Sequence, residues 1–88
     1  MWFITLVKFR RKPTKADTDS MNSYWAEAEK WGVKFHETLF TLGRYDVVAI
    51  FEAPDEKVAM RTSMLFAPEA KAETLVAVSR DEVVSWLQ

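Results

Sequence analysis

Apolar residues recur with two different spacings along this chain, and the order of those spacings leaves few folds open. Residues 2–10 send apolar side chains alternately to two faces, which is typical of a β-strand. From about Thr14 or Asp17 to Trp31 the spacing becomes helical, with apolar residues at Met21, Tyr24, Trp25 and Ala28. Gly32 suits the position after a helix, so the sequence predicts a strand followed by a helix.

A hairpin follows this first helix. Residues 33–42 and 45–53 are rich in β-branched and aromatic residues, and each segment predicts a strand. Gly43-Arg44 lies between the two segments and predicts a two-residue turn of type II′, in which glycine takes the first place.

A second helix, a fourth strand and a short last helix complete the order. Asp55 is a suitable N-cap for a helix that runs to about Ala67, just before a proline. Residues 73–78 predict a strand, and a capping box that begins at Ser79 predicts the last helix. The order β-α-β-β-α-β is the ferredoxin-like pattern. We therefore predict one α+β domain over residues 1–88, with a four-stranded antiparallel sheet and a short C-terminal helix.

The sheet is predicted to be apolar on both faces, although two helices cover only one face. The third strand, for example, carries Val48 and Ile50 on one face and Val47 and Ala49 on the other. Hydrophobic residues make up 49% of the chain, which is more than the thin core of an 88-residue domain needs. We therefore expect two copies to pair their sheets face to face, as a homodimer or a larger homo-oligomer. The alternative is that the C-terminal helix covers the second face within one chain.

Composition argues against several other classes of protein. No apolar run approaches the roughly 20 residues of a membrane-spanning helix, and the apolar N-terminus lacks the basic leader of a signal peptide. Without cysteine, the chain has no disulfide, no thiolate nucleophile and no zinc finger. The net charge of −1 argues against nucleic-acid binding, and the third strand lacks the stacking aromatics of an RRM domain. We expect a cytoplasmic protein that binds neither membranes nor nucleic acids.

One segment resembles a known family. Residues 42–56, LGRYDVVAIFEAPDE, resemble the signature of the GYD-domain family with its G-x-Y-D turn, and the flanking strands extend the resemblance over nearly the whole chain. This family is similar to the dimeric α/β-barrel proteins, which implies two ferredoxin-like units with their sheets face to face. Relatives on that wider fold include cofactor-free monooxygenases, isomerases, haem-degrading enzymes and amino-acid-sensing modules. The resemblance therefore implies a fold and a dimer but no single activity.

The turn Gly43-Arg44-Tyr45-Asp46 is the first candidate site, and two interpretations of it remain open. In the structural interpretation, the glycine supplies a positive φ angle, and Tyr45 and Asp46 lock the mouth of the hairpin. In the functional interpretation, the Arg, Tyr and Asp side chains face a ligand at the rim of a pocket.

The predicted hairpin also places three carboxylates on one face. Counting back from the turn gives the pairs Leu42–Tyr45, Glu37–Ile50 and Phe35–Glu52. One face then gathers Phe35, Glu37, Leu39, Thr41, Asp46, Val48, Ile50 and Glu52. The other gathers His36, Thr38, Phe40, Leu42, Tyr45, Val47, Ala49 and Phe51. Inside a dimeric barrel, burial would raise the pKa of a carboxylate and let it act as a base, whereas at a strand end the carboxylate would stay in water.

His36 is the only histidine of the chain. The alternation places it on the face opposite Glu37, so the two side chains are not expected to bind one metal ion. A single histidine without cysteine makes a poor transition-metal site, and haem would need this residue as its axial ligand. We therefore expect no metal and no cofactor, and His36 is either a partly buried strand residue or a catalyst.

Two further groups of side chains could contact a ligand. Aromatic residues of the first helix, Trp25 among them, could line a pocket for an apolar molecule, or could simply form the core. A basic cluster around the first loop could meet a phosphate or carboxylate, or could be solvated: Lys8, Arg10, Arg11, Lys12 and Lys15.

Two functions remain open. The first is a homo-oligomeric small-molecule-binding or assembly module, whose ligand would be a small apolar or acidic molecule held near Trp25, Arg44 and Tyr45. The second is a cofactor-independent enzyme of the monooxygenase or isomerase type, with an apolar barrel cavity and these catalytic candidates: His36, Glu37, Tyr45 and Asp46. An enclosed cavity with a few convergent polar groups would favour the enzyme. Because the sequence contains no strong catalytic constellation, it favours the first function.

Overall fold

The predicted strands form one four-stranded antiparallel sheet in the computed structural model, which describes residues 1–66 and 70–88. The strands lie in the order β2-β3-β1-β4. Their bounds are β1 Trp2–Phe9, β2 Lys34–Phe40, β3 Val47–Glu52 and β4 Ala70–Ala77. The first strand, apolar on both faces, occupies a central position, and β4 begins earlier than the predicted start at Glu73.

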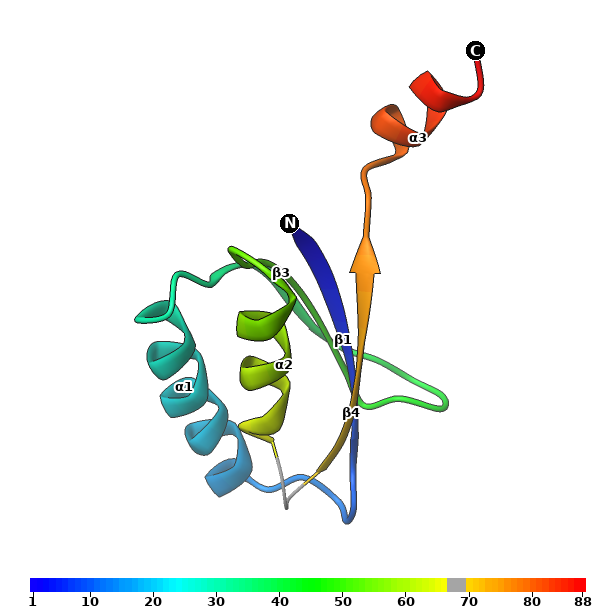
Figure 1. The fold of residues 1–88 in the computed structure, drawn as a ribbon. Coiled ribbons are helices and arrows are strands. Elements are labelled where there is room, and N and C mark those ends of the chain that lie inside the picture. Colours follow the sequence, from blue (N-terminus) through cyan, green and yellow to red (C-terminus); the bar gives the residue numbers. More distant parts are fainter. Residues whose placement is uncertain (67–69) are drawn as a thin grey trace.

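Two helices cover one face of this sheet (Figure 1). They are α1, Lys15–Glu29, and α2, Glu56–Met64. The element order confirms the predicted ferredoxin-like α+β fold. The expected end of the second helix at Ala67 and Pro68 lies outside the described residues.

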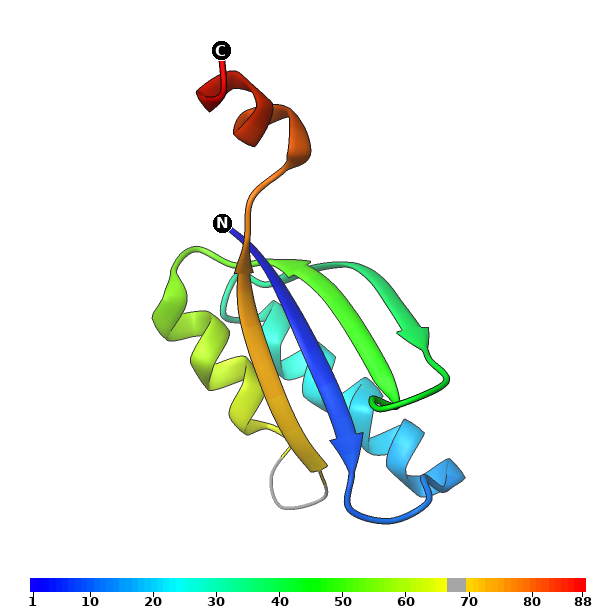
Figure 2. The ribbon, with the colours of Figure 1, turned by 90° about the vertical axis from the view of Figure 1, so that its right-hand side faces the viewer.

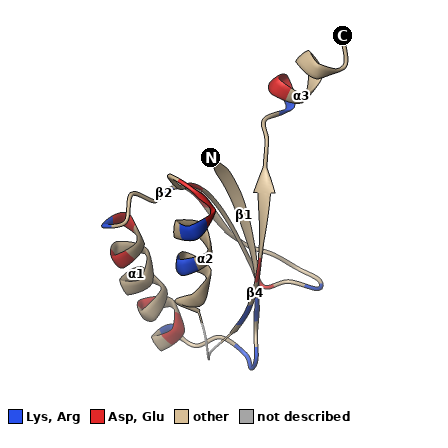
Figure 3. Ribbon diagram, viewed as in Figure 1, with Lys and Arg blue, Asp and Glu red and all other residues tan. Residues whose placement is uncertain are grey.

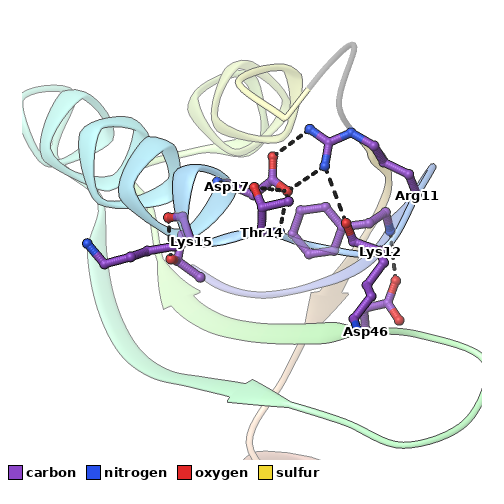
Figure 4. Close-up of polar contacts among 8 residues, drawn as sticks. Arg11, Lys12, Thr14, Lys15, Asp17 and Asp46 are labelled. Carbon is purple, nitrogen blue, oxygen red and sulfur yellow. Dashed lines mark hydrogen bonds and ion pairs between the residues drawn. The ribbon is translucent and has the colours of Figure 1, made fainter.

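The start of α1 is held by a capping box that involves Thr14 and Asp17 (Figure 4). The Asp17 carboxylate accepts hydrogen bonds from the Thr14 backbone N–H at 2.7 Å and from the Thr14 hydroxyl at 3.1 Å. The Arg11 guanidinium donates to both oxygens of the same carboxylate, at 2.9 and 3.0 Å. One member of the predicted basic cluster is therefore engaged in holding the first helix.

The core lies between the helices and the sheet, and it consists of two clusters of buried residues. One cluster gathers around Phe3 and Phe51 with Ala28 of α1, and the other around Val7 and Val47 with further residues: Phe9, Met21, Phe66 and Ala70. Thr5 is also buried, and its hydroxyl is paired with that of Thr74 at 2.8 Å. Alternate residues of β1 and β3 thus point toward the helices, which leaves the intervening residues on the other face.

A β-bulge in β2 changes the register that simple alternation predicts. Glu37 pairs with Ile50 as expected. Beyond that pair the register shifts by one residue, so Phe35 pairs with Phe51 and not with Glu52. The cause is one extra residue in β2 opposite β3, which is the definition of a bulge.

The bulge corrects two side-chain placements. Phe35 faces the helices, where its ring lies 5.5 Å from the rings of both Trp25 and Phe51, so its predicted place beside Glu37 is wrong. His36 is the extra residue and contacts Glu52, on the face away from the helices. The prediction that His36 lies on the opposite face from Glu37 is therefore also wrong.

The hairpin between β2 and β3 ends in a longer loop than predicted. The last backbone hydrogen bond of the hairpin runs from the Thr41 N–H to the Asp46 carbonyl at 2.9 Å, and the strand register does not extend to a Leu42–Tyr45 pair. Residues 42–45 therefore form the loop in place of a two-residue type II′ turn. Gly43 has a φ of 101°, so the expected positive φ angle is present.

The last helix, α3 Arg80–Trp86, lies away from the rest of the molecule (Figures 1 and 2). It continues the direction of β4 and does not fold back over the sheet. None of its residues is buried. The alternative in which this helix covers the second sheet face of its own chain is therefore wrong. Within the described residues, no helix is both long enough and apolar enough to cross a membrane.

Candidate functional site

The sheet surface that faces away from α1 and α2 is named here the open face, and Figure 2 views the sheet from this side. Alternate residues of all four strands form it: Trp2, Ile4, Leu6 and Lys8 of β1, Lys34, Glu37 and Leu39 of β2, Val48, Ile50 and Glu52 of β3, and Lys71, Glu73, Leu75 and Ala77 of β4. These side chains have no helix above them.

The centre of the open face is apolar. Ile4 pairs with Ile50 on one side and with Leu75 on the other, so three branched side chains form a row across β3, β1 and β4. Leu39 and Leu75 are 48% and 42% exposed. A surface of this kind excludes water only when another surface covers it.

A histidine–carboxylate pair lies at one end of the open face. The His36 Nε2 atom lies 2.6 Å from the Glu52 Oε2 atom, and the Trp2 ring stacks on the imidazole with 4.4 Å between ring centroids. Trp2 also pairs with Glu52 in the sheet register, so β1, β2 and β3 all contribute to this cluster. Such a pair can accept and return a proton, and the bulge is what brings it together. Glu37, another catalytic candidate from the sequence, follows His36 in β2 and pairs with Ile50 of β3.

The other end of the open face holds a second polar cluster. The Tyr45 hydroxyl donates to Glu73 Oε2 at 3.0 Å. The tyrosine side chain thus reaches from the hairpin loop to β4. This hydrogen bond, together with desolvation and the charge of Glu73, raises the pKa of Tyr45 above its ordinary value near 10.0. The Arg44 guanidinium lies over the Tyr45 ring, 5.7 Å from its centroid.

Asp46 has a structural role beside this cluster. Its backbone N–H donates to the Val7 carbonyl at 2.8 Å, and its Oδ2 atom accepts from the Phe9 backbone N–H at 2.8 Å. Its Oδ1 atom lies 3.5 Å from Lys8 Nζ. The carboxylate thus fastens the hairpin to β1, and its contacts do not run across the mouth of the hairpin itself.

A hollow of about 250 Å³ opens where the second cluster meets the sheet. Its lining residues are Leu6, Lys8, Arg44, Tyr45, Lys71, Ala72 and Glu73. Basic residues gather in this region, around the loop after β1, the start of β4 and the hairpin loop (Figure 3). Sequence reasoning selected Arg44 and Tyr45 but missed Lys71 and Glu73. The missed signal was the alternation of Lys71, Glu73 and Leu75 on one strand face.

Trp25, the remaining ligand candidate, lies on the opposite side of the sheet. It packs against the core cluster around Val7, and its ring lies 5.5 Å from that of Phe35. It also lines a hollow of about 270 Å³ between α1 and β2, together with Thr18, Met21, Asn22, Thr38 and Phe40. The structure therefore does not bring Trp25 together with Arg44 and Tyr45. Among the described residues, no three His, Cys, Asp or Glu side chains lie close enough to hold a metal ion.

Comparisons with known proteins agree with this architecture. The family model of the GYD domain matches residues 3–87. The crystal structure of SCO4226 from Streptomyces coelicolor A3(2) is similar, with a TM-score of 0.60 and 15% sequence identity over 88% of this chain and 98% of that chain. At this identity the similarity shows the fold alone. No curated protein matches the chain.

Proposed function

The chain therefore belongs to the GYD domain family, and on that premise we propose that it is a homo-oligomeric small-molecule-binding or assembly module. The observation that carries this proposal is the uncovered apolar centre of the open face, around Ile4, Ile50 and Leu75. The simplest cover is the same face of a second copy, as in a dimeric α/β barrel, because two-fold symmetry then buries both faces together.

The size and shape of a single copy support pairing. The accessible surface is 6091 Å². A compact monomer of this mass would expose only about 5300 Å², so the excess is close to the roughly 800 Å² that each partner buries in a standard interface. The radius of gyration is 13.8 Å. A compact domain of this length would have a radius of gyration of about 12 Å.

The position of α3 is a second reason to expect a partner. The helix contains only seven residues, and Trp86 and Leu87 at its end are 62% and 80% exposed. Isolated helices shorter than about 12 residues are marginal in water, so α3 needs a surface to pack on. A second copy supplies that surface when the arm formed by residues 78–88 crosses to it.

The substitution Ile50→Asp tests the proposed interface. It places a charge at the centre of the open face, so we expect monomers or insoluble protein where the parent protein forms dimers or larger assemblies. Light scattering at micromolar concentration measures the difference. The matched control is Leu42→Asp, because Leu42 is fully exposed in the hairpin loop. A parent protein that is monomeric at this concentration, or normal dimers from Ile50→Asp, would contradict the proposed pairing.

A cofactor-independent enzyme of the monooxygenase or isomerase type is the second candidate. The His36–Glu52 pair favours it, because a hydrogen-bonded acid–base pair lies beside an apolar surface that pairing would enclose. Native mass spectrometry of the purified protein would identify a small molecule carried through purification. If that molecule is turned over, we expect His36→Gln to abolish turnover while binding remains. Unchanged turnover in this variant would exclude the pair as the catalyst.

A further inference from the structure

Three cations from separate parts of the chain meet at the end of the open face that lies away from His36. Lys8 comes from β1, Arg44 from the hairpin loop and Lys71 from β4, and all three line the hollow of about 250 Å³. A second hollow, of about 310 Å³, shares the two lysines and adds Phe9 and Arg10. Positive charge therefore converges here in a chain whose net charge is −1.

The two lysines occupy an unfavourable position relative to each other. Lys8 pairs directly with Lys71 in the antiparallel register of β1 and β4. Side chains opposite each other in such a pair have Cβ atoms about 5 Å apart, and like charges there destabilise the sheet. An anion bound between the two ammonium groups would attract both of them and so offset their mutual repulsion.

The nearby carboxylates leave part of this charge unbalanced. Asp46 lies 3.5 Å from Lys8, and the Glu73 carboxylate accepts the Tyr45 hydroxyl. Among the residues that the structure describes, neither Arg44 nor Lys71 has a carboxylate oxygen within 4.0 Å. Two of the three cations are therefore available to a ligand.

We propose that this hollow binds a small organic anion whose carboxylate or phosphate group lies among Lys8, Arg44 and Lys71. The apolar body of the ligand packs against Leu6 and the Tyr45 ring, which line the same hollow. This inference rests on the small-molecule-binding part of the proposed function.

Two-dimensional NMR of the full-length chain tests the site, with benzoate and phenyl phosphate as probes and benzyl alcohol as an uncharged analogue. We expect both anions, but not the alcohol, to shift the amide signals of residues around Lys8, Arg44 and Lys71. The anion that binds more tightly identifies the preferred headgroup. Added salt should weaken binding, because salt screens the attraction between the anion and the three cations.

Two variants measure the contribution of the unpaired cations. Arg44→Gln and Lys71→Gln should each weaken anion binding about tenfold, which is the effect of losing one charge-assisted hydrogen bond. The matched control is Lys57→Gln, which makes the same change in net charge on the exposed surface of α2. An equal loss of affinity in the Lys57 variant, shifts with benzyl alcohol equal to those with the anions, or no localised shifts at millimolar anion would each overturn the proposed site.

Light scattering on the same samples separates this inference from the proposed assembly. Assemblies that form without localised anion shifts would overturn the anion site and leave the assembly module standing. Localised anion binding by a monomer would support the site and contradict the assembly.

Discussion

At the scale of single residues, Asp17 shows how a charged side chain is accommodated in a buried position. It is only 7% exposed, yet the Thr14 N–H, the Thr14 hydroxyl and the Arg11 guanidinium all donate to its carboxylate. The hydrogen bond from the Thr14 backbone, and then that from Arg11, lowers the pKa of Asp17 below its ordinary value of 3.8. Its ionised form also suits the positive end of the α1 dipole.

The lowered pKa predicts an acid-dependent part of the stability. Because the folded-state pKa lies below the unfolded value of 3.8, the Asp17 contribution is present above that value and is lost as the pH falls through the folded-state pKa. Asp17→Asn should lower the melting temperature at neutral pH and make it fall less steeply below about pH 4. Thermal unfolding at a series of pH values measures this. Asp19→Asn, on the same helix, is the control, and an unchanged acid slope in the Asp17 variant would contradict the prediction.

At the scale of the elements, the bulge in β2 determines which side chains enter the core and which reach the open face. It turns Phe35 toward Trp25 and Phe51, and it brings His36 to Glu52. One extra residue thus changes both a packing contact and a candidate acid–base pair.

The bulge predicts unequal effects of truncating two phenylalanines of the same strand. Phe35 is packed against the core, so Phe35→Ala should reduce the free energy of unfolding by about 2–3 kcal/mol, somewhat less than at a fully buried site. Phe40 is 60% exposed, and Phe40→Ala should cost below about 1 kcal/mol. Denaturant unfolding at one protein concentration compares the two variants. Equal losses would support the unbulged register in place of the observed one.

At the scale of the whole molecule, a single copy has a covered face, an open face and an arm. The principal extents of 47 × 31 × 17 Å describe a thin body that α3 lengthens in one direction (Figure 1). The short dimension corresponds to one sheet and one helix layer. A second sheet on the open face would give the closed, layered arrangement that larger domains adopt.

The arm predicts an effect on assembly that leaves the fold of the single copy intact. Trp86→Ala should weaken association about tenfold or more, because burying an aromatic side chain in the partner contributes at least about 1.4 kcal/mol. Sedimentation velocity measures the association, and circular dichroism should show unchanged secondary structure in the body. Gln88→Ala is the control on the same arm. Association of the Trp86 variant as tight as that of the parent would show that α3 does not reach the other copy.

Local sequence by itself was sufficient for the element order, the family resemblance, the capping residue Ser79 and the positive φ angle at Gly43. These features depend on residue types within one turn of helix or one short strand, where spacing and side-chain chemistry act directly. The apolar character of both sheet faces was equally evident, because alternation along a strand needs no knowledge of its neighbours.

The tertiary structure alone decided the register of β2, the length of the hairpin loop and the composition of both polar clusters. A bulge is a relation between two strands, and alternation in one strand cannot reveal it. Lys8, Arg44 and Lys71 are distant in sequence and meet only because β4 pairs with β1 while the hairpin loop lies beside them. The chemistry of the candidate sites therefore arises from strand pairing, which joins residues that no local pattern connects.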